Sequence, residues 1–371
     1  MSDSETEIVT DLSSPDVTTK YMAAAGIANK ALEAVIAAAV PGADIAELCE
    51  LGDRVMIEET AKLYNKKDKY GDKMIKGVAF PTCVSPTDVC GHFSPLKDES
   101  RSLVEGEIVK IDLACHIDGF IAAAAHTVVV GDVEVSGRAA DVVHAAWNAA
   151  EAALRKVRVG GESTEVTKVI EDVAAEYGVE ALQGIYSYEM RHHQLDAAHA
   201  IPNKTQPGVE SFQFGLNEVY AMDVIFTTGE GKAKETEYRT TVLKRAHENN
   251  YVLKSQKGRE FITEVNKIAP TLAFSLRQLE DPLMAKLGAT EAKRHRLVEE
   301  FPVMKEKEGE VLAQFKFTVL LLPGGTKKIT GVSFSQAGQF ATDKTVQNEE
   351  LRALLATSAN PKKLKKKANQ N

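Results

Sequence analysis

The 371-residue chain has only four cysteines, a single tryptophan and no long apolar run. Cys49, Cys83, Cys90 and Cys115 do not have the spacing of a zinc finger. No segment is long and apolar enough to span a bilayer, and the first residues lack the hydrophobic region of a signal peptide. We therefore expect an intracellular protein whose cysteines are reduced thiols in the core.

Positive charge is in the minority, but it is clustered. The chain has 45 Lys and Arg residues against 53 Asp and Glu, a net charge of −8. Residues 62–76 contain six lysines, residues 244–267 contain six basic residues, and the segment PKKLKKK near the C-terminus contains five lysines. Local clusters rather than the total determine attraction to a polyanion. The plainer interpretation of each cluster is a solvated helix face.

The hydrophobic pattern predicts two successive blocks of two helices followed by strands, which suggests an internal duplication. The first block comprises helices at 20–40 and about 43–64 and strand segments at 77–92 and 107–130. The second comprises helices at 136–157 and 163–177 and strand segments near 180–190, 217–228 and 237–245. A strand in EVLAQFKFTVLLLP and a short helix near 347–357 complete the pattern.

The chain is expected to form one mixed α/β domain between two tails. Residues 1–15 are acidic and Ser-rich and are predicted to be a disordered tail, and residues 16–358 form the domain. A basic, mainly helical insertion is expected at about 246–308, and a Lys-rich tail at 359–371.

The segment KIDLACHIDGFIAAAAHT, residues 110–127, predicts a β-hairpin with an Asp-Gly turn at 118–119. This pair suits a two-residue type I′ turn, in which both residues have positive φ. The resulting register pairs Asp112 with Ala125 and makes Ala123 a diagonal neighbour of Asp112 on the same face. A carboxylate at 123 could join Asp112 in bridging divalent cations, but alanine cannot. Asp112 could instead be an ordinary polar residue on a solvated strand.

This hairpin resembles the metal-binding hairpin of type 2 methionine aminopeptidases, which have the pita-bread fold. The resemblance extends over nearly the whole chain. CGHFSPLK, TGEGKAK and KEGEVLAQFKFTVLLLPGG resemble the catalytically inactive branch of the fold, the proliferation-associated (ErbB-receptor-binding) protein family. The resemblance implies an α/β (α+β) architecture: two pseudo-symmetric helix-plus-strand halves around a curved antiparallel sheet, with a helical insertion.

The resemblance also implies a degenerate site. The aminopeptidases hold two metal ions with two Asp, one His and two Glu, and another His, matched by His92, handles the substrate. Asp112 matches the first Asp, and Asp223 shortens the first Glu by one methylene. The second Asp, the ligand His and the second Glu fall on Ala123, Tyr188 and Lys316. We therefore expect no catalytic residue, no bound metal and no cofactor.

Lys316 suggests a further hypothesis. Two carboxylates that face each other without a metal ion would be costly to bury. The Lys316 ammonium could lie between Asp112 and Asp223 and replace the missing cation. His92 is then expected to be a pocket histidine with a hydrogen-bond partner rather than a catalytic residue.

Members of the family are similar to ribosome-associated proteins, which implies a monomer that binds the large subunit and ribosomal RNA near the nascent-chain exit. Such a protein would act in ribosome biogenesis, translation or growth control, in the cytoplasm, nucleus and nucleolus. RNA contact would be made through phosphates, which Lys and Arg neutralise without sequence preference. The candidate residues are Lys244, Arg245, Lys254, Lys257, Arg259, Arg277, Lys293, Arg294, Arg296, Lys362, Lys363, Lys365, Lys366 and Lys367.

Two other functions stay open at this point. One is a metal-dependent methionine aminopeptidase with an altered site, which would need Asp112 and Asp223, with or without His92, to bind metal. The other is an adaptor that grips peptides or proteins with the emptied pocket. Fold alone does not choose among these functions.

Overall fold

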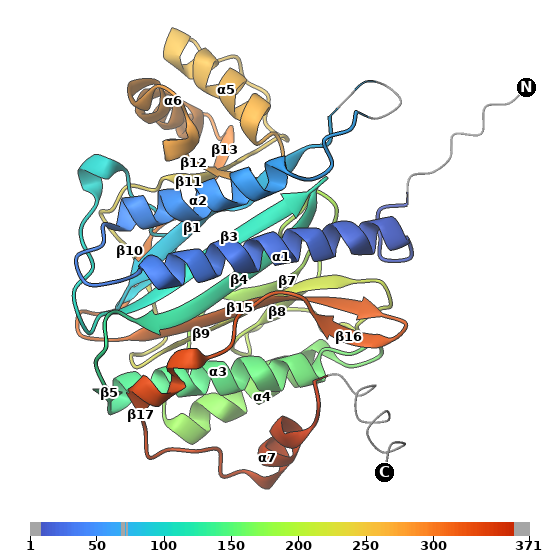
Figure 1. Cartoon of the computed structure of the whole chain (residues 1–371), viewed down its shortest axis with the longest axis vertical. Helices are drawn as coiled ribbons and strands as arrows, with labels where there is room; N and C mark the ends of the chain where they lie inside the picture. Colours follow the sequence, from blue (N-terminus) through green and yellow to red (C-terminus); the bar gives the residue numbers. More distant parts are fainter. Residues whose placement is uncertain (1–8, 68–70, 72, 360–371) are drawn as a thin grey trace, which may run out of the picture.

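The computed structural model describes residues 9–67, 71 and 73–359. Nine strands form its central sheet: β1 (Lys76–Pro86), β3 (Ile108–Ile117), β4 (Phe120–Val129), β6 (Glu180–Ala181), β7 (Tyr186–Glu189), β8 (Ala200–Pro202), β9 (Val219–Thr227), β15 (Leu312–Leu322) and β16 (Gly325–Lys328). The strand order is β1-β3-β4-β15-β9-β7-β8, with β16 beside β15 and β6 beside β9 (Figure 1). All ladders of this sheet are antiparallel.

The molecule consists of two similar halves that meet where β4 pairs with β15. In the first half, α1 (Pro15–Ala38) and α2 (Ile45–Ala61) pack on β1, β3 and β4. In the second, α3 (Arg138–Lys156) and α4 (Ser163–Tyr177) form the matching pair, and α3 packs on β9 and β15. Each half has its own apolar core, and the two helix pairs lie on either side of the β4–β15 junction in Figure 1. The predicted pita-bread architecture is confirmed.

The first helix begins earlier than its apolar pattern indicated. It starts at Pro15 rather than near residue 20, with Ser14 as the N-cap. Proline is favoured at this position because its missing N–H would have no helical partner there. Leu12, which the sequence placed in the acidic tail, is buried in the first core. The expected tail is therefore too long at its inner end, while residues 1–8 lie outside the described part.

The hairpin of β3 and β4 has the predicted register. Asp112 pairs with Ala125, and Ala123 lies diagonally across from it, opposite Ala114. The turn residues Asp118 and Gly119 have φ values of 54° and 75°, as a type I′ turn requires. Every residue of both strands is buried, which explains why small alanines follow each other along β4. The hairpin is enclosed by α1 on one side and by the pocket described below on the other.

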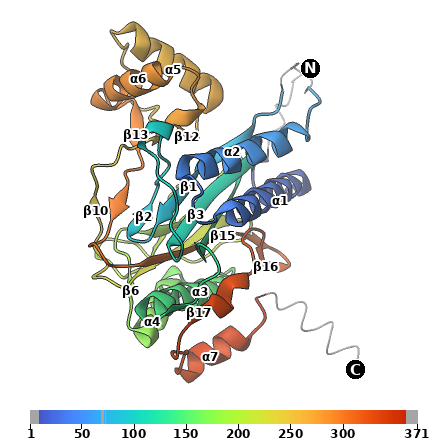
Figure 2. The same ribbon diagram turned by 60° about the vertical axis from the view of Figure 1, so that its left-hand side comes forward.

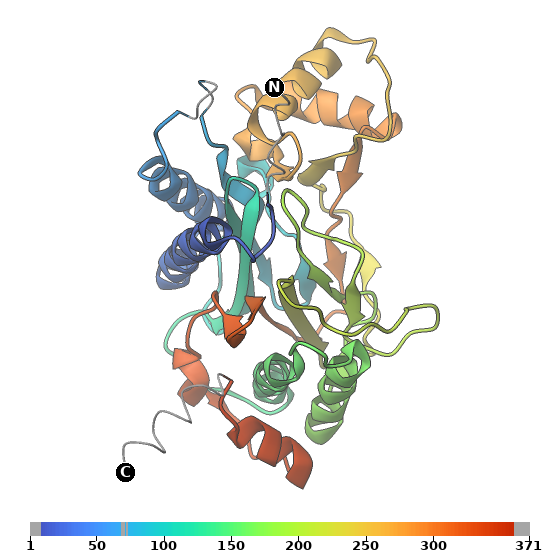
Figure 3. The ribbon, with the colours of Figure 1, turned by 90° about the vertical axis from the view of Figure 1, so that its right-hand side faces the viewer.

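The insertion is a small module with its own sheet, not a purely helical segment. It comprises β11 (Val242–Arg245), α5 (Gln256–Ile268), β12 (Ala273–Ser275), α6 (Pro282–Arg294) and β13 (Val298–Glu300). The strands pair in the order β12-β11-β13 beneath the two helices, and a separate apolar cluster fills the space between them. The module begins at β11, before the predicted residue 246, and projects from the end of the molecule near α2 (Figures 2 and 3).

Short elements complete the chain. They are β2 (Val89–Gly91), β5 (Val135–Ser136), β10 (Lys234–Glu235), β14 (Met304–Lys305), β17 (Phe340–Ala341), α7 (Glu349–Ala356) and the 3₁₀ turns Lys97–Glu99, Leu276–Gln278 and Ser335–Gln339. All four cysteines are buried and free, as expected, and burial raises the pKa of Cys49 to about 11. Within the described ranges, no helix combines the length and apolar character needed to cross a membrane.

Candidate functional site

Four neighbouring strands place one residue each in a row across the middle of the sheet. Asp112 of β3 pairs with Ala125 of β4, Ala125 pairs with Lys316 of β15, and Lys316 pairs with Asp223 of β9. Two carboxylates that are far apart in the sequence therefore flank one lysine. The register of the sheet alone fixes this arrangement.

The Lys316 ammonium lies between the two carboxylates, as hypothesised. Its Nζ is 2.5 Å from Asp112 Oδ2 and 2.9 Å from Asp223 Oδ2. The side chains are largely buried, with exposures of 15% for Lys316, 8% for Asp112 and 14% for Asp223. The amide nitrogen of Gln314 donates a further hydrogen bond of 2.8 Å to Asp223 Oδ1. One ammonium thus neutralises part of the charge of both acids.

The titration of this cluster reflects burial and mutual charge. Burial alone would lower the pKa of Lys316, but Asp112 and Asp223 outweigh this effect and raise it above its ordinary value. Burial raises the pKa of Asp223, Lys316 opposes the rise, and Asp112 adds to it. The lysine is therefore a cation throughout the neutral pH range. An incoming metal ion would have to displace its ammonium group.

All six positions of the predicted degenerate site line one cavity of about 290 Å³. They are His92, Asp112, Ala123, Tyr188, Asp223 and Lys316. The rest of the wall includes apolar and aromatic side chains such as Phe80, Tyr186, Leu195 and Phe301. The predicted positions therefore share one pocket, which has a charged base and a wall of apolar and aromatic side chains.

His92 has a defined partner and tautomer in this pocket. Its Nδ1 is 3.1 Å from the carbonyl oxygen of Pro302. A carbonyl can only accept, so Nδ1 carries the proton and Nε2 is left with a lone pair. Burial lowers the pKa of His92, so the ring is neutral at neutral pH. The ring also packs edge-on against Phe301, in agreement with the expected role of a pocket histidine.

The pocket does not fit the pair of metal ions that the aminopeptidase fold implies. Bridging two ions requires carboxylates from both sides of the site. Ala123 offers a methyl group, Tyr188 a phenol whose pKa is raised by burial, and Lys316 a positive charge where an anionic ligand is needed. Asp112 and Asp223 are both occupied by the ammonium. No hydrolytic step through metal ions can be derived for this set of side chains.

Comparison with known proteins agrees with this geometry. The profile of metallopeptidase family M24 matches residues 19–241, more than half of the chain. ERBB-3 binding protein 1 of Arabidopsis thaliana is 42% identical over 95% of this chain and 88% of its own. Proliferation-associated protein A of Dictyostelium discoideum is 40% identical, with 97% and 92% covered. The chain belongs to the proliferation-associated (ErbB-receptor-binding) protein family.

Solved structures place this family member within the aminopeptidase fold. A thermophilic Arx1 is 28% identical, covers 94% of this chain and 99% of its own, and has a TM-score of 0.85. Methionine aminopeptidase of Thermotoga maritima is 17% identical, with 87% and 100% covered and a TM-score of 0.59. The second likeness shows the fold alone.

The predicted RNA-contacting residues of the insertion module fall into two groups. The first group is engaged within the protein. Lys244 pairs with Asp196 at 3.1 Å and with Glu299 at 3.3 Å, Lys257 with Asp281 at 2.6 Å, and Lys293 with Glu300 at 2.7 Å. Arg245 donates to the carbonyl oxygens of Ala246 and Leu297.

Arg277 was wrong as a candidate for RNA contact. Its guanidinium is 5% exposed and pairs with the buried Asp53 at 2.9 Å. It also donates to the Ser94 hydroxyl and backbone carbonyl. Arg277 therefore holds the insertion module to α2 and to the segment that follows β2, a buried role that a sequence cannot distinguish from a surface one.

The second group is exposed at one end of the module and comprises Lys254, Arg259, Arg294 and Arg296. Glu291 of α6 accepts from the backbone N–H of Lys254, and Arg259 donates to the Lys254 carbonyl. Arg294 and Arg296 flank His295, whose ring stacks on Tyr251 at 3.8 Å. These contacts bring the four side chains to a common end of α5 and α6, which we call the basic end. Lys362, Lys363, Lys365, Lys366 and Lys367 lie outside the described residues.

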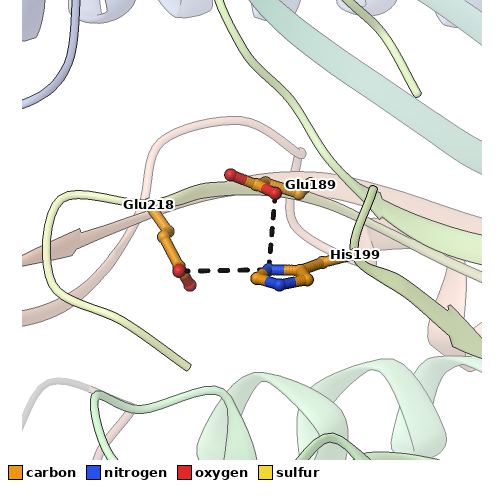
Figure 4. Close-up of side chains that lie close together, drawn as sticks. All are labelled: Glu189, His199 and Glu218. Carbon is orange, nitrogen blue, oxygen red and sulfur yellow. Dashed lines mark ion pairs between the residues drawn. The ribbon is translucent and has the colours of Figure 1, made fainter. Parts of the chain in front are cut away.

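Sequence reasoning missed one group of chemically capable side chains. Glu189, His199 and Glu218 converge at the edge of the second half (Figure 4). They come from three separate segments, so no motif or spacing signalled them. The register of β7 against β9, which places Glu189 beside Tyr220, was needed to bring them together.

Proposed function

We propose that this protein is a pseudoenzyme that binds the large ribosomal subunit and ribosomal RNA near the nascent-chain exit, in ribosome biogenesis, translation or growth control. The observation that carries the non-catalytic part is the Lys316 ammonium between Asp112 and Asp223. A fold that cannot assemble its metal pair retains its surfaces and its pocket as means of recognition. We propose a monomer that works in the cytoplasm and the nucleus, including the nucleolus.

Nucleic-acid contact is supported by charge and by a relative's name. The basic end presents Lys254, Arg259, Arg294 and Arg296 on a module that has its own apolar core. The curved DNA-binding protein of Schizosaccharomyces pombe is 33% identical over 98% of this chain and 96% of its own. Folded basic surfaces suit structured RNA, whose shape and backbone are recognised rather than its bases. The Lys-rich tail from residue 359 would add further phosphate contacts.

Co-sedimentation with purified large ribosomal subunits across a salt series tests the proposal. The test variant carries Lys254→Glu, Arg294→Glu and Arg296→Glu, and a second variant lacks residues 361–371. Pelleting should weaken with salt, and each lost phosphate contact should reduce the slope of log K against log salt by about 0.7–0.9. The matched control places the same charge change on other exposed lysines, with Lys30→Glu, Lys168→Glu and Lys327→Glu.

The expected result is loss of binding in the test variant and in the deletion, with the control close to the unchanged protein. Absence of pelleting at low salt would refute the ribosome proposal. An equal loss in the control would show that net charge, rather than the basic end, drives the association.

A second candidate function uses the pocket. Its aromatic wall and partly neutralised acidic base favour a small group that carries an apolar body and a positive charge, such as a peptide N-terminus. Titration with short Met-initiated peptides tests this candidate, because Phe301→Ala should abolish binding without affecting ribosomes. Peptide cleavage in the presence of Co²⁺ or Mn²⁺ would instead favour the altered aminopeptidase.

A further inference from the structure

Three potential metal ligands converge where strands β7, β8 and β9 lie side by side. Glu189 ends β7, His199 precedes β8, and Glu218 precedes β9. His199 Nδ1 is 3.4 Å from Glu189 Oε2 and 3.9 Å from Glu218 Oε1. One ligand atom from each side chain lies within 4.8 Å of the other two (Figure 4). Within the described residues, no other three His, Cys, Asp or Glu side chains converge in this way.

Each of the three side chains is held by a neighbour that is not itself a ligand. The His199 ring stacks on Phe212 at 4.2 Å with the planes 8° apart. One oxygen of Glu218 accepts from the Gly215 N–H at 2.7 Å and from the Tyr220 hydroxyl at 2.8 Å, so the other oxygen faces the imidazole. Such supporting contacts orient the ligands of metal sites in proteins.

Arg191 engages the third side chain. It donates to both carboxylate oxygens of Glu189, at 2.8 Å and 3.2 Å. A carboxylate oxygen can accept from two directions, so Oε2 retains a lone pair toward His199. Arg191 thus balances the charge of Glu189, while the Glu218 carboxylate adds a negative charge on the other side of His199.

We propose that Glu189, His199 and Glu218 bind a single divalent transition-metal ion of the zinc class. A tetrahedral zinc site with bonds of about 2.0–2.1 Å places its ligand atoms about 3.3 Å apart. The His199–Glu189 separation already has this value within 0.1 Å, and the Glu218 oxygen, 3.9 Å from His199 Nδ1, has to move closer. Mixed imidazole and carboxylate ligands suit Zn²⁺ and its neighbours rather than Mg²⁺ or Ca²⁺.

The site is separate from the degenerate pocket. Tyr188 lines the pocket, and the next residue of β7, Glu189, points to the opposite face because side chains alternate along a strand. An ion there would join the ends of three strands and fix the loop between β7 and β8. Its role is structural, since its three ligands come from three segments that meet at this edge of the sheet.

Cobalt substitution tests the proposal on the full-length protein. After dialysis against a chelator, Co²⁺ titration should produce the visible absorption of a low-coordinate site at one equivalent, and Zn²⁺ should remove it. His199→Gln should abolish the absorption. Tyr220→Phe keeps the three ligands but loses the hydroxyl, which donates to Glu218 and lies 3.2 Å from His199 Nδ1, and it should weaken binding about 10-fold. Because the phenylalanine variant retains the ring that packs in the sheet, it addresses the case in which the glutamine variant fails to fold.

Two controls locate the ion. His247→Gln removes a histidine of the insertion module, and Asp223→Asn alters the degenerate pocket. Both should keep the absorption and the increase in melting temperature with Zn²⁺. Absence of absorption in the unchanged protein, or its retention in His199→Gln, would overturn the proposal. The three side chains would then form an imidazole–carboxylate network only.

Discussion

Replacement of Lys316 by methionine should destabilise the protein in a way that depends on pH. Methionine fills a similar volume but leaves Asp112 and Asp223 facing each other without a cation. Loss of one partner of a buried ion pair costs about 3–5 kcal/mol. Because Lys316 keeps 15% of its exposure, we expect the lower end, about 3 kcal/mol.

This loss can be measured by urea unfolding at pH 7. With an unfolding entropy of about 2.1 cal/mol/K per residue, the melting temperature should fall by about 4 °C for a chain of this length. Lys30→Met serves as the control, because Lys30 forms an exposed ion pair with Glu59, and such pairs contribute little. The variant that combines Lys316→Met with Asp112→Asn and Asp223→Asn should recover most of the lost stability, since no uncompensated charge remains.

The pH dependence gives an independent check. Burial already raises the pKa of Asp223 in the folded protein, and loss of the ammonium removes the effect that opposes this rise. A carboxyl group whose folded pKa is raised stabilises the folded state at low pH and loses that contribution as the pH rises through the folded pKa. The penalty of Lys316→Met should therefore shrink between pH 7 and pH 4. A loss below about 1 kcal/mol that does not change with pH would refute the proposed role of Lys316.

Three further changes test other parts of the structure. Arg277→Met leaves the buried Asp53 without its partner and should cost about 3–5 kcal/mol, with earlier proteolysis of the insertion module. Gly52→Ala would place its Cβ 2.3 Å from the Thr82 hydroxyl oxygen and should lower stability by about 1–3 kcal/mol in urea unfolding. Lys110 is buried and donates to the Thr87 carbonyl oxygen, with no carboxylate partner among the described residues, and burial lowers its pKa to about 7. A base with a depressed folded pKa destabilises the folded state most below that pKa, so Lys110→Met should stabilise the protein at pH 7 and less at pH 10, as measured by unfolding at both values.

The sequence was most informative where local chemistry determined geometry. The Asp-Gly pair at 118–119 fixed the hairpin register, and the register placed Asp112 and Ala123 on one face. The six pocket positions followed from the resemblance, and all of them line one cavity. The position of the Lys316 ammonium followed from the cost of leaving two buried carboxylates unpaired.

Features that depend on distant partners could not be predicted. The three-residue strands β12 and β13 are too short to show a period, so the insertion was predicted to be mainly helical and its sheet was not foreseen. Lys244 and Lys293 looked like free basic residues, but Asp196, Glu299 and Glu300 neutralise them across the tertiary structure. The convergence of Glu189, His199 and Glu218 likewise depends on pairing between β7 and its neighbours.

The changes in the pocket are consistent with each other when its charges are counted. In the aminopeptidases that the hairpin resembles, four carboxylates balance two divalent ions. Here two carboxylates, Asp112 and Asp223, face one ammonium, which leaves a single negative charge. Loss of the carboxylate at 123 is what allows one lysine to replace two ions. Ala123→Asp alone would therefore add a third carboxylate beside one ammonium, so a site that holds two metal ions requires position 316 to change in the same step.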